Sequence, residues 1–282
     1  MTTMAVRRRP IIGWGLHDGL VVARRNLIQT IRIPELLFFS IVQPVIFVLL
    51  FAFVFGGAIP IPGSDPTAAA DASIYRQYLM PGIFGQTVAF ASAASTVGLA
   101  EDMHRGIIDR FRSLPMAAGG VLLGRTFADA ARQVLVLFVL SVTGFLIGWR
   151  INDGILNAIY AYLLLLFFAY TLSWIGSWIG LYMPNPETAQ TAGLVWLFPL
   201  TFLSNAFVPI SSMPTWLQPI AQWNPISSLV LATRELFGNP TGIVGEAWPQ
   251  QNPILDTLIS CVVLIAIFAP LAVRRYRRTT AR

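Results

Sequence analysis

The chain has 282 residues, of which 55% are hydrophobic and only 11% are charged. Because globular domains carry about 25% charged residues, this composition excludes an ordinary soluble domain and predicts a polytopic membrane protein. All 19 basic residues are arginine, so the chain has no lysine for a Walker A loop, and any ATP hydrolysis must take place on another polypeptide.

The fold class predicted from hydropathy is an all-α polytopic membrane protein. Residues 1–34 are expected to form a cytoplasmic arm and then an amphipathic helix in the membrane interface, because apolar and charged residues separate onto two faces from Trp14 to Ile33. Six apolar stretches follow, each about as long as the 20 residues that cross a hydrocarbon core. We expect these spans at 36–55, 78–99, 127–148, 155–182, 188–208 and 254–273.

Two segments between the spans break the apolar pattern. Residues 100–115 are the one interior segment dense in charge, and their charged and apolar positions separate as on a short cytoplasmic helix. A solvated loop whose charges only set the topology fits this spacing equally well. Residues 209–238 are partly apolar but interrupted by prolines and rich in tryptophan. They predict two short helices at the external interface, arranged as a re-entrant hairpin.

Short-range patterns also predict contacts inside the membrane domain. Asp129 and Arg132 are spaced to pair on one helix face. Small residues at i and i+4 allow two helices to approach closely in lipid. Such pairs occur at Gly144/Gly148 and Gly176/Gly180.

The distribution of arginine predicts the topology. With both termini inside, only Arg76, Arg150 and Arg234 fall in external segments, and the other sixteen are cytoplasmic. Such a bias orients membrane proteins and requires an even number of spans. We therefore expect a multi-pass protein of the bacterial plasma membrane with both termini in the cytoplasm. Because the net charge of +6 is located at span ends, its partner is the lipid bilayer and not nucleic acid.

The chemistry-bearing residues argue against several function classes. His17 and His104 lie far apart, and Cys261 is the single cysteine, so we predict no metal site, no disulfide and no catalytic residues. The predicted spans have essentially no ionisable residue at their centres, which argues against an ion-coupled secondary transporter. That transporter class stays open as an alternative, since a carrier that uses only backbone oxygens would escape the argument.

Four motifs resemble one transporter family. The run AEDMHRGIIDRFRSLPMA, with LMPGIF before it and GRTFAD after it, resembles the ABC-2 permeases of the daunorubicin/doxorubicin-resistance type. The segment FVPISSMPTWLQPIAQWNPIS is similar to the external region of that family before its last span. The resemblance extends over essentially the whole chain.

This resemblance implies a six-span half of a type V ATP-driven exporter. It implies a coupling helix at 100–115 and a re-entrant region at 209–238. Two such halves, identical or paralogous, would form the pore, and two ABC ATPase subunits would bind ATP and Mg below them. This chain itself would hold no cofactor. The residues implied at the ATPase contact are Glu101, Asp102, Arg105, Gly106, Asp109, Arg110 and Arg112.

The apolar, aromatic bundle predicts an amphipathic substrate, drug-like or lipid-like, that is exported from the cytoplasm or the inner leaflet. Related ABC-2 permeases move polysaccharide or glycolipid, which is the alternative within the family. The side chains predicted to line the substrate path are Phe47, Gln86, Phe90, Phe198, Phe202 and Asn205. For each of them, ordinary helix packing is the competing interpretation.

Overall fold

The computed structural model describes residues 11–32, 34–55, 72–107, 118–242 and 247–279. Every regular element within these ranges is a helix, so the all-α fold class is confirmed. The long helices are α1 (Ile11–Arg32), α2 (Pro34–Val54), α3 (Ala72–His104), α5 (Ala118–Leu146), α6 (Gly154–Gly180), α7 (Pro186–Phe202) and α11 (Pro253–Thr279). The short elements are η1 (Ile210–Ser212), α8 (Gln218–Gln222), α9 (Pro225–Phe237) and α10 (Trp248–Gln251).

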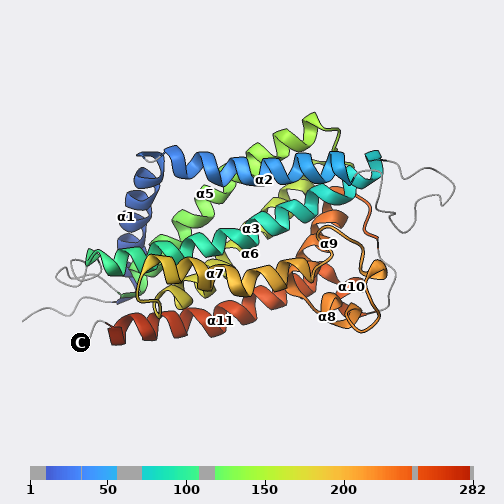
Figure 1. The fold of residues 1–282 in the computed structure, drawn as a ribbon. Coiled ribbons are helices and arrows are strands. Elements are labelled where there is room, and N and C mark those ends of the chain that lie inside the picture. Colours follow the sequence, from blue (N-terminus) through green and yellow to red (C-terminus); the bar gives the residue numbers. More distant parts are fainter. Residues whose placement is uncertain (1–10, 33, 56–71, 108–117, 243–246, 280–282) are drawn as a thin grey trace, which may run out of the picture.

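The long helices form a bundle with two different ends (Figure 1). Helices α2, α3, α5, α6, α7 and α11 lie lengthwise, whereas α1 runs across one end and packs mainly against α5. We call this the α1 end, and α11 finishes there too. The short helices α8, α9 and α10 gather at the opposite end, which we call the α9 end.

Four helical stretches are long and apolar enough to cross a membrane. They are Ala72–His104, Gly120–Leu146, Gly154–Gly180 and Pro253–Arg278. Helix α7 has 17 residues and a rise of about 26 Å, which is shorter than a hydrocarbon core of about 30 Å. The apolar part of α2, Phe38–Val54, is also shorter than the other four. The full set of six spans therefore stays a prediction.

Helix α3 is longer than the predicted span at 78–99 and reaches into the charged segment. Residues 100–104 of the predicted coupling helix form the last turn of α3 itself. The helix then ends in a turn at Gly106, whose φ of +66° is one that glycine adopts without strain. The rest of the predicted coupling helix, from residue 108 on, lies outside the described residues.

Close backbone contacts join α3 to α6. A Cβ atom added to Gly176 would lie 2.3 Å from the carbonyl oxygen of Ser92, and one added to Gly180 would lie 2.6 Å from that of Thr96. The predicted Gly176/Gly180 pair therefore marks a helix–helix contact that only glycine permits. The Gly144/Gly148 pair differs, because Gly148 lies after the end of α5 with a φ of +101°.

Candidate functional site

Asp102, near the end of α3, binds two arginines from other helices at the α1 end. It forms ion pairs with Arg125 of α5 and with Arg25 of α1, the latter at 3.7 Å. Gly98, one helical turn before Asp102, leaves room for the Arg125 guanidinium, since an added Cβ would lie 1.8 Å from its Nη2. We call Asp102, Arg25 and Arg125 the Asp102 cluster. It ties α1, α3 and α5 together.

The predicted ATPase-contact residues divide into two groups. Glu101 pairs with Arg105 at 2.5 Å, and both side chains are largely exposed at the end of α3. Asp102 is instead half-buried in its cluster, and Gly106 forms the turn that follows. The other three predicted residues lie outside the described residues: Asp109, Arg110 and Arg112. This pair and the exposed His104 between its members are thus accessible to a partner.

A cavity of about 230 Å³ lies between α2, α3 and α5. It runs from the surface of the bundle inward, because Gln43 and Ala94 on its wall are exposed whereas Gln86 and Gln133 are buried. Half of its lining residues are polar and half are apolar. The lining residues are Ser40, Gln43, Pro44, Phe47, Gln86, Thr87, Phe90, Ala91, Ala94, Arg132, Gln133 and Val136. Three of the six predicted substrate-lining residues, Phe47, Gln86 and Phe90, are therefore brought together here.

Two further predicted residues, Phe198 and Phe202 of α7, extend from this cavity through a series of ring contacts. Adjacent rings lie between 4.5 and 6.1 Å apart, as is usual for paired aromatic side chains. In order of contact the rings are Phe90, Phe198, Phe202, Phe207, Phe51 and Phe47. We call these six the phenylalanine chain. Its first and last rings, Phe90 and Phe47, both line the cavity. The rings between them extend along α7 toward the α9 end and return through Phe51 of α2.

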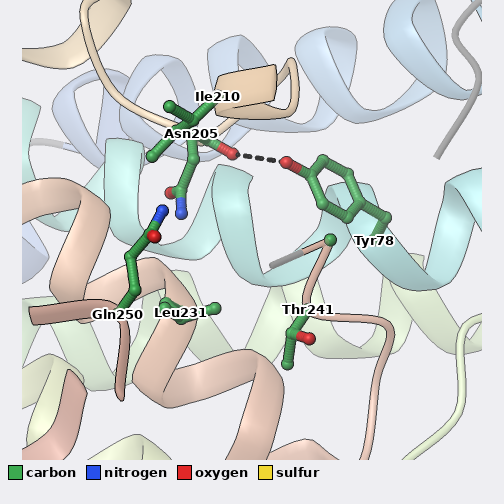
Figure 2. Close-up of a pocket in the computed structure, with 7 residues that line it drawn as sticks. Tyr78, Asn205, Ile210, Leu231, Thr241 and Gln250 are labelled. Atoms are coloured by element: carbon green, nitrogen blue, oxygen red, sulfur yellow. Dashed lines mark hydrogen bonds between the residues drawn. The ribbon is translucent and has the colours of Figure 1, made fainter. Parts of the chain in front are cut away.

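The sixth predicted residue, Asn205, lies elsewhere. It borders a cavity of about 10 Å³, which has room for about one water molecule and none for a drug-sized ligand. Figure 2 shows the Tyr78 hydroxyl pointing at the backbone oxygen of Asn205, to which it donates a hydrogen bond of 3.1 Å. The side chain of Gln250 approaches Asn205 from the other side of this small cavity.

Arg234 of α9 is fully buried next to this small cavity. Its Nε donates to the carbonyl oxygen of Tyr78 at 3.0 Å, and its Nη2 donates to the carbonyl oxygens of Asn205 at 2.9 Å and Ala206 at 3.3 Å. Its guanidinium carbon lies 3.4 Å from the centre of the Tyr78 ring. The sequence predicted only that Arg234 belongs to an external segment. The structure adds that its side chain is enclosed by α3 and the segment after α7.

The part of the chain that the structure describes contains no candidate metal site. No group of three or more His, Cys, Asp or Glu gathers there in a way that could hold an ion. The chemistry that these residues offer is that of ion pairing, hydrogen bonding and aromatic contact.

Comparisons with known proteins decide the family. Residues 19–237 match the family described as ABC-2 type transporter. The daunorubicin resistance ABC transporter permease protein DrrB1 of Streptomyces coeruleorubidus is 32% identical over 282 residues, which cover 99% of this chain and 93% of that protein. This chain belongs to the ABC-2 type transporter family. The ABC-2 resemblance of the sequence motifs is thereby confirmed.

Two more relatives support this assignment to the ABC-2 permeases. The doxorubicin resistance ABC transporter permease protein DrrB of Mycobacterium tuberculosis is 30% identical over 205 residues, 72% of this chain and 71% of that protein. The putative transport permease ycf38 of Cyanophora paradoxa is 25% identical over 257 residues, 90% of this chain and 85% of that protein. The chain is therefore a multi-helical permease subunit of a family that does not itself carry out catalysis.

Sequence reasoning missed several polar residues of this ABC-2 permease. Ser40, Arg132 and Gln133 line the cavity but were not among the predicted lining residues. Arg132 had one signal, its spacing from Asp129, and the predicted pair is confirmed at 3.5 Å. That spacing did not indicate that the guanidinium also borders a cavity. Arg234 had a signal too, since it follows an apolar run in α9.

Proposed function

We propose that this chain is the transmembrane subunit of an ATP-driven exporter of amphipathic, drug-like or lipid-like molecules. The observation that carries the proposal is the match to the ABC-2 family over most of the chain, joined to relatives whose names state daunorubicin and doxorubicin resistance. ATP and Mg would bind to separate ATPase subunits, two in each complex. A second permease half, identical or paralogous, would complete the pore.

The cavity between α2, α3 and α5 suits an amphipathic substrate. Ligand sites are mostly apolar, with a few polar groups that fix the orientation of the ligand. This cavity combines apolar side chains with several polar ones, and its exposed edge at Gln43 and Ala94 would admit a molecule from the lipid side. The phenylalanine chain continues the apolar surface toward the α9 end. In this proposal the substrate's apolar part moves along these rings.

The α1 end would receive the ATPase subunits. The exposed Glu101–Arg105 pair can exchange its internal contact for one with a partner at little cost, because surface ion pairs contribute only about 0–1 kcal/mol. ATP-driven closure of the ATPase subunits would move the end of α3. The Asp102 cluster would transmit that movement to α1 and α5, since it joins these three helices. The α1 end would face the cytoplasm, and η1, α8 and α9 would form the external re-entrant region.

The test measures ATP-dependent uptake into inverted membrane vesicles that contain the full chain and its co-expressed ATPase. The probes are doxorubicin and a dansyl-labelled fatty acid. We expect uptake of at least one probe with ATP, none with a non-hydrolysable analogue, and no effect of an ionophore that dissipates ion gradients. Uptake that persists without ATP, or that stops when the gradient is dissipated, would instead indicate a secondary transporter.

A variant pair locates the ATPase contact within the same experiment. The double variant Arg105→Glu with Arg110→Glu should lose co-purification of the ATPase while it still inserts into the membrane. Arg150→Glu is the control, because it reverses the charge of an exposed arginine near the α9 end, away from this segment, and should leave co-purification unchanged. Equal co-purification of the ATPase with the double variant would contradict the coupling role of this segment.

A further inference from the structure

One charged side chain lies on the wall of the cavity between α2, α3 and α5. Among its lining residues, Arg132 of α5 is the one that is formally charged at neutral pH. The other polar side chains on the wall are neutral: Ser40, Gln43, Gln86, Thr87 and Gln133. Asp129, the acidic neighbour of Arg132, is not among the lining residues. Arg132 is therefore the charged group that a ligand in this cavity would meet.

The guanidinium of Arg132 keeps donors for a ligand. Arginine has five N–H donors, and the contact between its Nη2 and Asp129 at 3.5 Å engages at most one of them. Asp129 is itself engaged on its other oxygen, where Oδ2 accepts a hydrogen bond of 2.6 Å from Ser95. Ser95 thus helps to hold Asp129 on the side of α3, away from the cavity lining.

Gln133, the next residue on the wall, has a side-chain donor without an acceptor. The residue is 2% exposed, and its Nε2 has no hydrogen-bond partner among the described residues. A buried donor without a partner is unfavourable, so an acceptor that entered the cavity beside it would be stabilised. Two adjacent residues of α5 thus offer hydrogen-bond donors to the same space.

We propose that this cavity binds amphiphiles whose polar end is anionic, such as a carboxylate or phosphate group. Arg132 binds the anionic group, Gln133 donates a hydrogen bond to it, and the apolar body lies on Phe47, Phe90 and Val136. This assignment rests on the proposed function and deepens its lipid-like branch, because it names the head-group chemistry of the site that the exporter would use. Arg132 is then a residue that determines substrate selectivity.

The test is equilibrium binding of three matched probes to the full chain with its ATPase in phosphatidylcholine nanodiscs. Each probe has the same dansyl label and alkyl chain, and they end in a carboxylate, a primary amide or an amine. We expect the carboxylate probe to bind about tenfold or more tightly than the amide, as is usual for a charged hydrogen bond. Arg132→Gln should remove that difference, and Arg132→Lys should retain most of it.

Arg24→Gln is the control, since Arg24 is exposed on α1 and does not border the cavity. It should leave the preference for the carboxylate unchanged. Equal binding of the three probes to the wild type would overturn the assignment. So would tightest binding of the amine, which would make Asp129 the polar anchor. An equal loss for all three probes in Arg132→Gln would show that Arg132 only supports packing, and thermal unfolding of each variant confirms that it is folded.

Two further measurements complete the test. One distinguishes a membrane lipid from a free amphiphile as the source of the anionic group, and the other distinguishes failure of this inference from failure of the exporter proposal. Displacement of the carboxylate probe by added phosphatidylglycerol identifies a membrane-lipid head group as the occupant, whereas insensitivity to that lipid identifies a free amphiphile. Both results keep the anionic assignment. If the carboxylate preference holds but vesicles show no ATP-dependent uptake, the exporter proposal fails and the site stands. If uptake is ATP-dependent but no preference exists, only this inference fails.

Discussion

Arg234 shows how a single charged side chain can be buried in this protein without an acidic partner. No ion pair among the described residues includes it. Instead it donates to three backbone carbonyl groups and lies over the ring of Tyr78. Asn205 and Ala206 lie three and four residues after the last residue of α7, in the segment that leads away from it. Arg234 therefore fastens the segment after α7 to α3.

We predict that Arg234→Met lowers the stability of the protein by at least about 3 kcal/mol, because the buried carbonyl groups of Asn205 and Tyr78 lose a charged donor. Arg234→Lys should recover part of this loss, since one ammonium group cannot reproduce the forked geometry of arginine. Thermal unfolding of the purified full chain in detergent measures both effects. Arg24→Gln serves as the exposed control, and an Arg234→Met protein that unfolds at the wild-type temperature would contradict the prediction.

At the scale of elements, glycine contacts determine where helix α1 lies. A Cβ added to Gly124 of α5 would lie 2.3 Å from the carbonyl oxygen of Gly19 and 2.8 Å from Cβ of Val22, so the two helices touch through their backbones. The Arg25–Asp102 ion pair lies further along α1 and adds a polar contact. Helix α1 is thus held against α5 and the end of α3. A movement of these two helices would therefore carry α1 with it.

We predict that Gly124→Val displaces α1 from α5. Overpacking of a close contact costs about 1–3 kcal/mol, so the displaced state should become about tenfold more populated. Trypsin cleavage of the full chain after Arg24 and Arg25 should accelerate by a similar factor, because proteolysis follows the population of the open form. Val21→Ala, on an exposed position of the same helix, should leave the rate unchanged. An unchanged rate in Gly124→Val would show that α1 does not depend on this contact.

At the scale of the whole molecule, the two ends of the bundle differ in charge. Most described arginines lie on α1, at the adjoining ends of α3 and α5, or at the end of α11, all near the α1 end. Near the α9 end, Arg76 and Arg150 bind backbone carbonyl groups of the residues that close α5. This asymmetry is the structural counterpart of the positive-inside pattern and predicts that the α1 end is cytoplasmic.

Labelling of single cysteines in whole cells tests this orientation. In a Cys261→Ala background, Ser211→Cys near η1 should react with a membrane-impermeant maleimide in intact cells. Glu187→Cys at the start of α7 and Arg278→Cys near the end of α11 should react only after permeabilisation. All three positions are exposed, so access to the reagent depends on the side of the membrane. Labelling of Glu187→Cys in intact cells would contradict both the orientation and the number of spans.

Much of this protein follows from its sequence, because the decisive quantities are compositional or local. Blocks of apolar residues predict the long helices, and the arginine count predicts their orientation. The Asp129–Arg132 pair and the Gly176 contact depend on spacings of a few residues along one helix. Phe47, Gln86 and Phe90 were predicted as lining residues from their side-chain types, and the structure places all three at one cavity.

Only the tertiary structure decides which faces meet. Helices of a membrane bundle are apolar on all sides, so hydrophobic periodicity carries little information on the inward face. The bond from Arg234 to Tyr78 joins residues 156 positions apart, and nothing local to either one predicts it. The same holds for Asp102 between two arginines and for Arg132 and Gln133 at the cavity. Composition and short-range spacing thus determine the class, the helices and the family, whereas the charged contacts of the candidate site arise only when the helices pack.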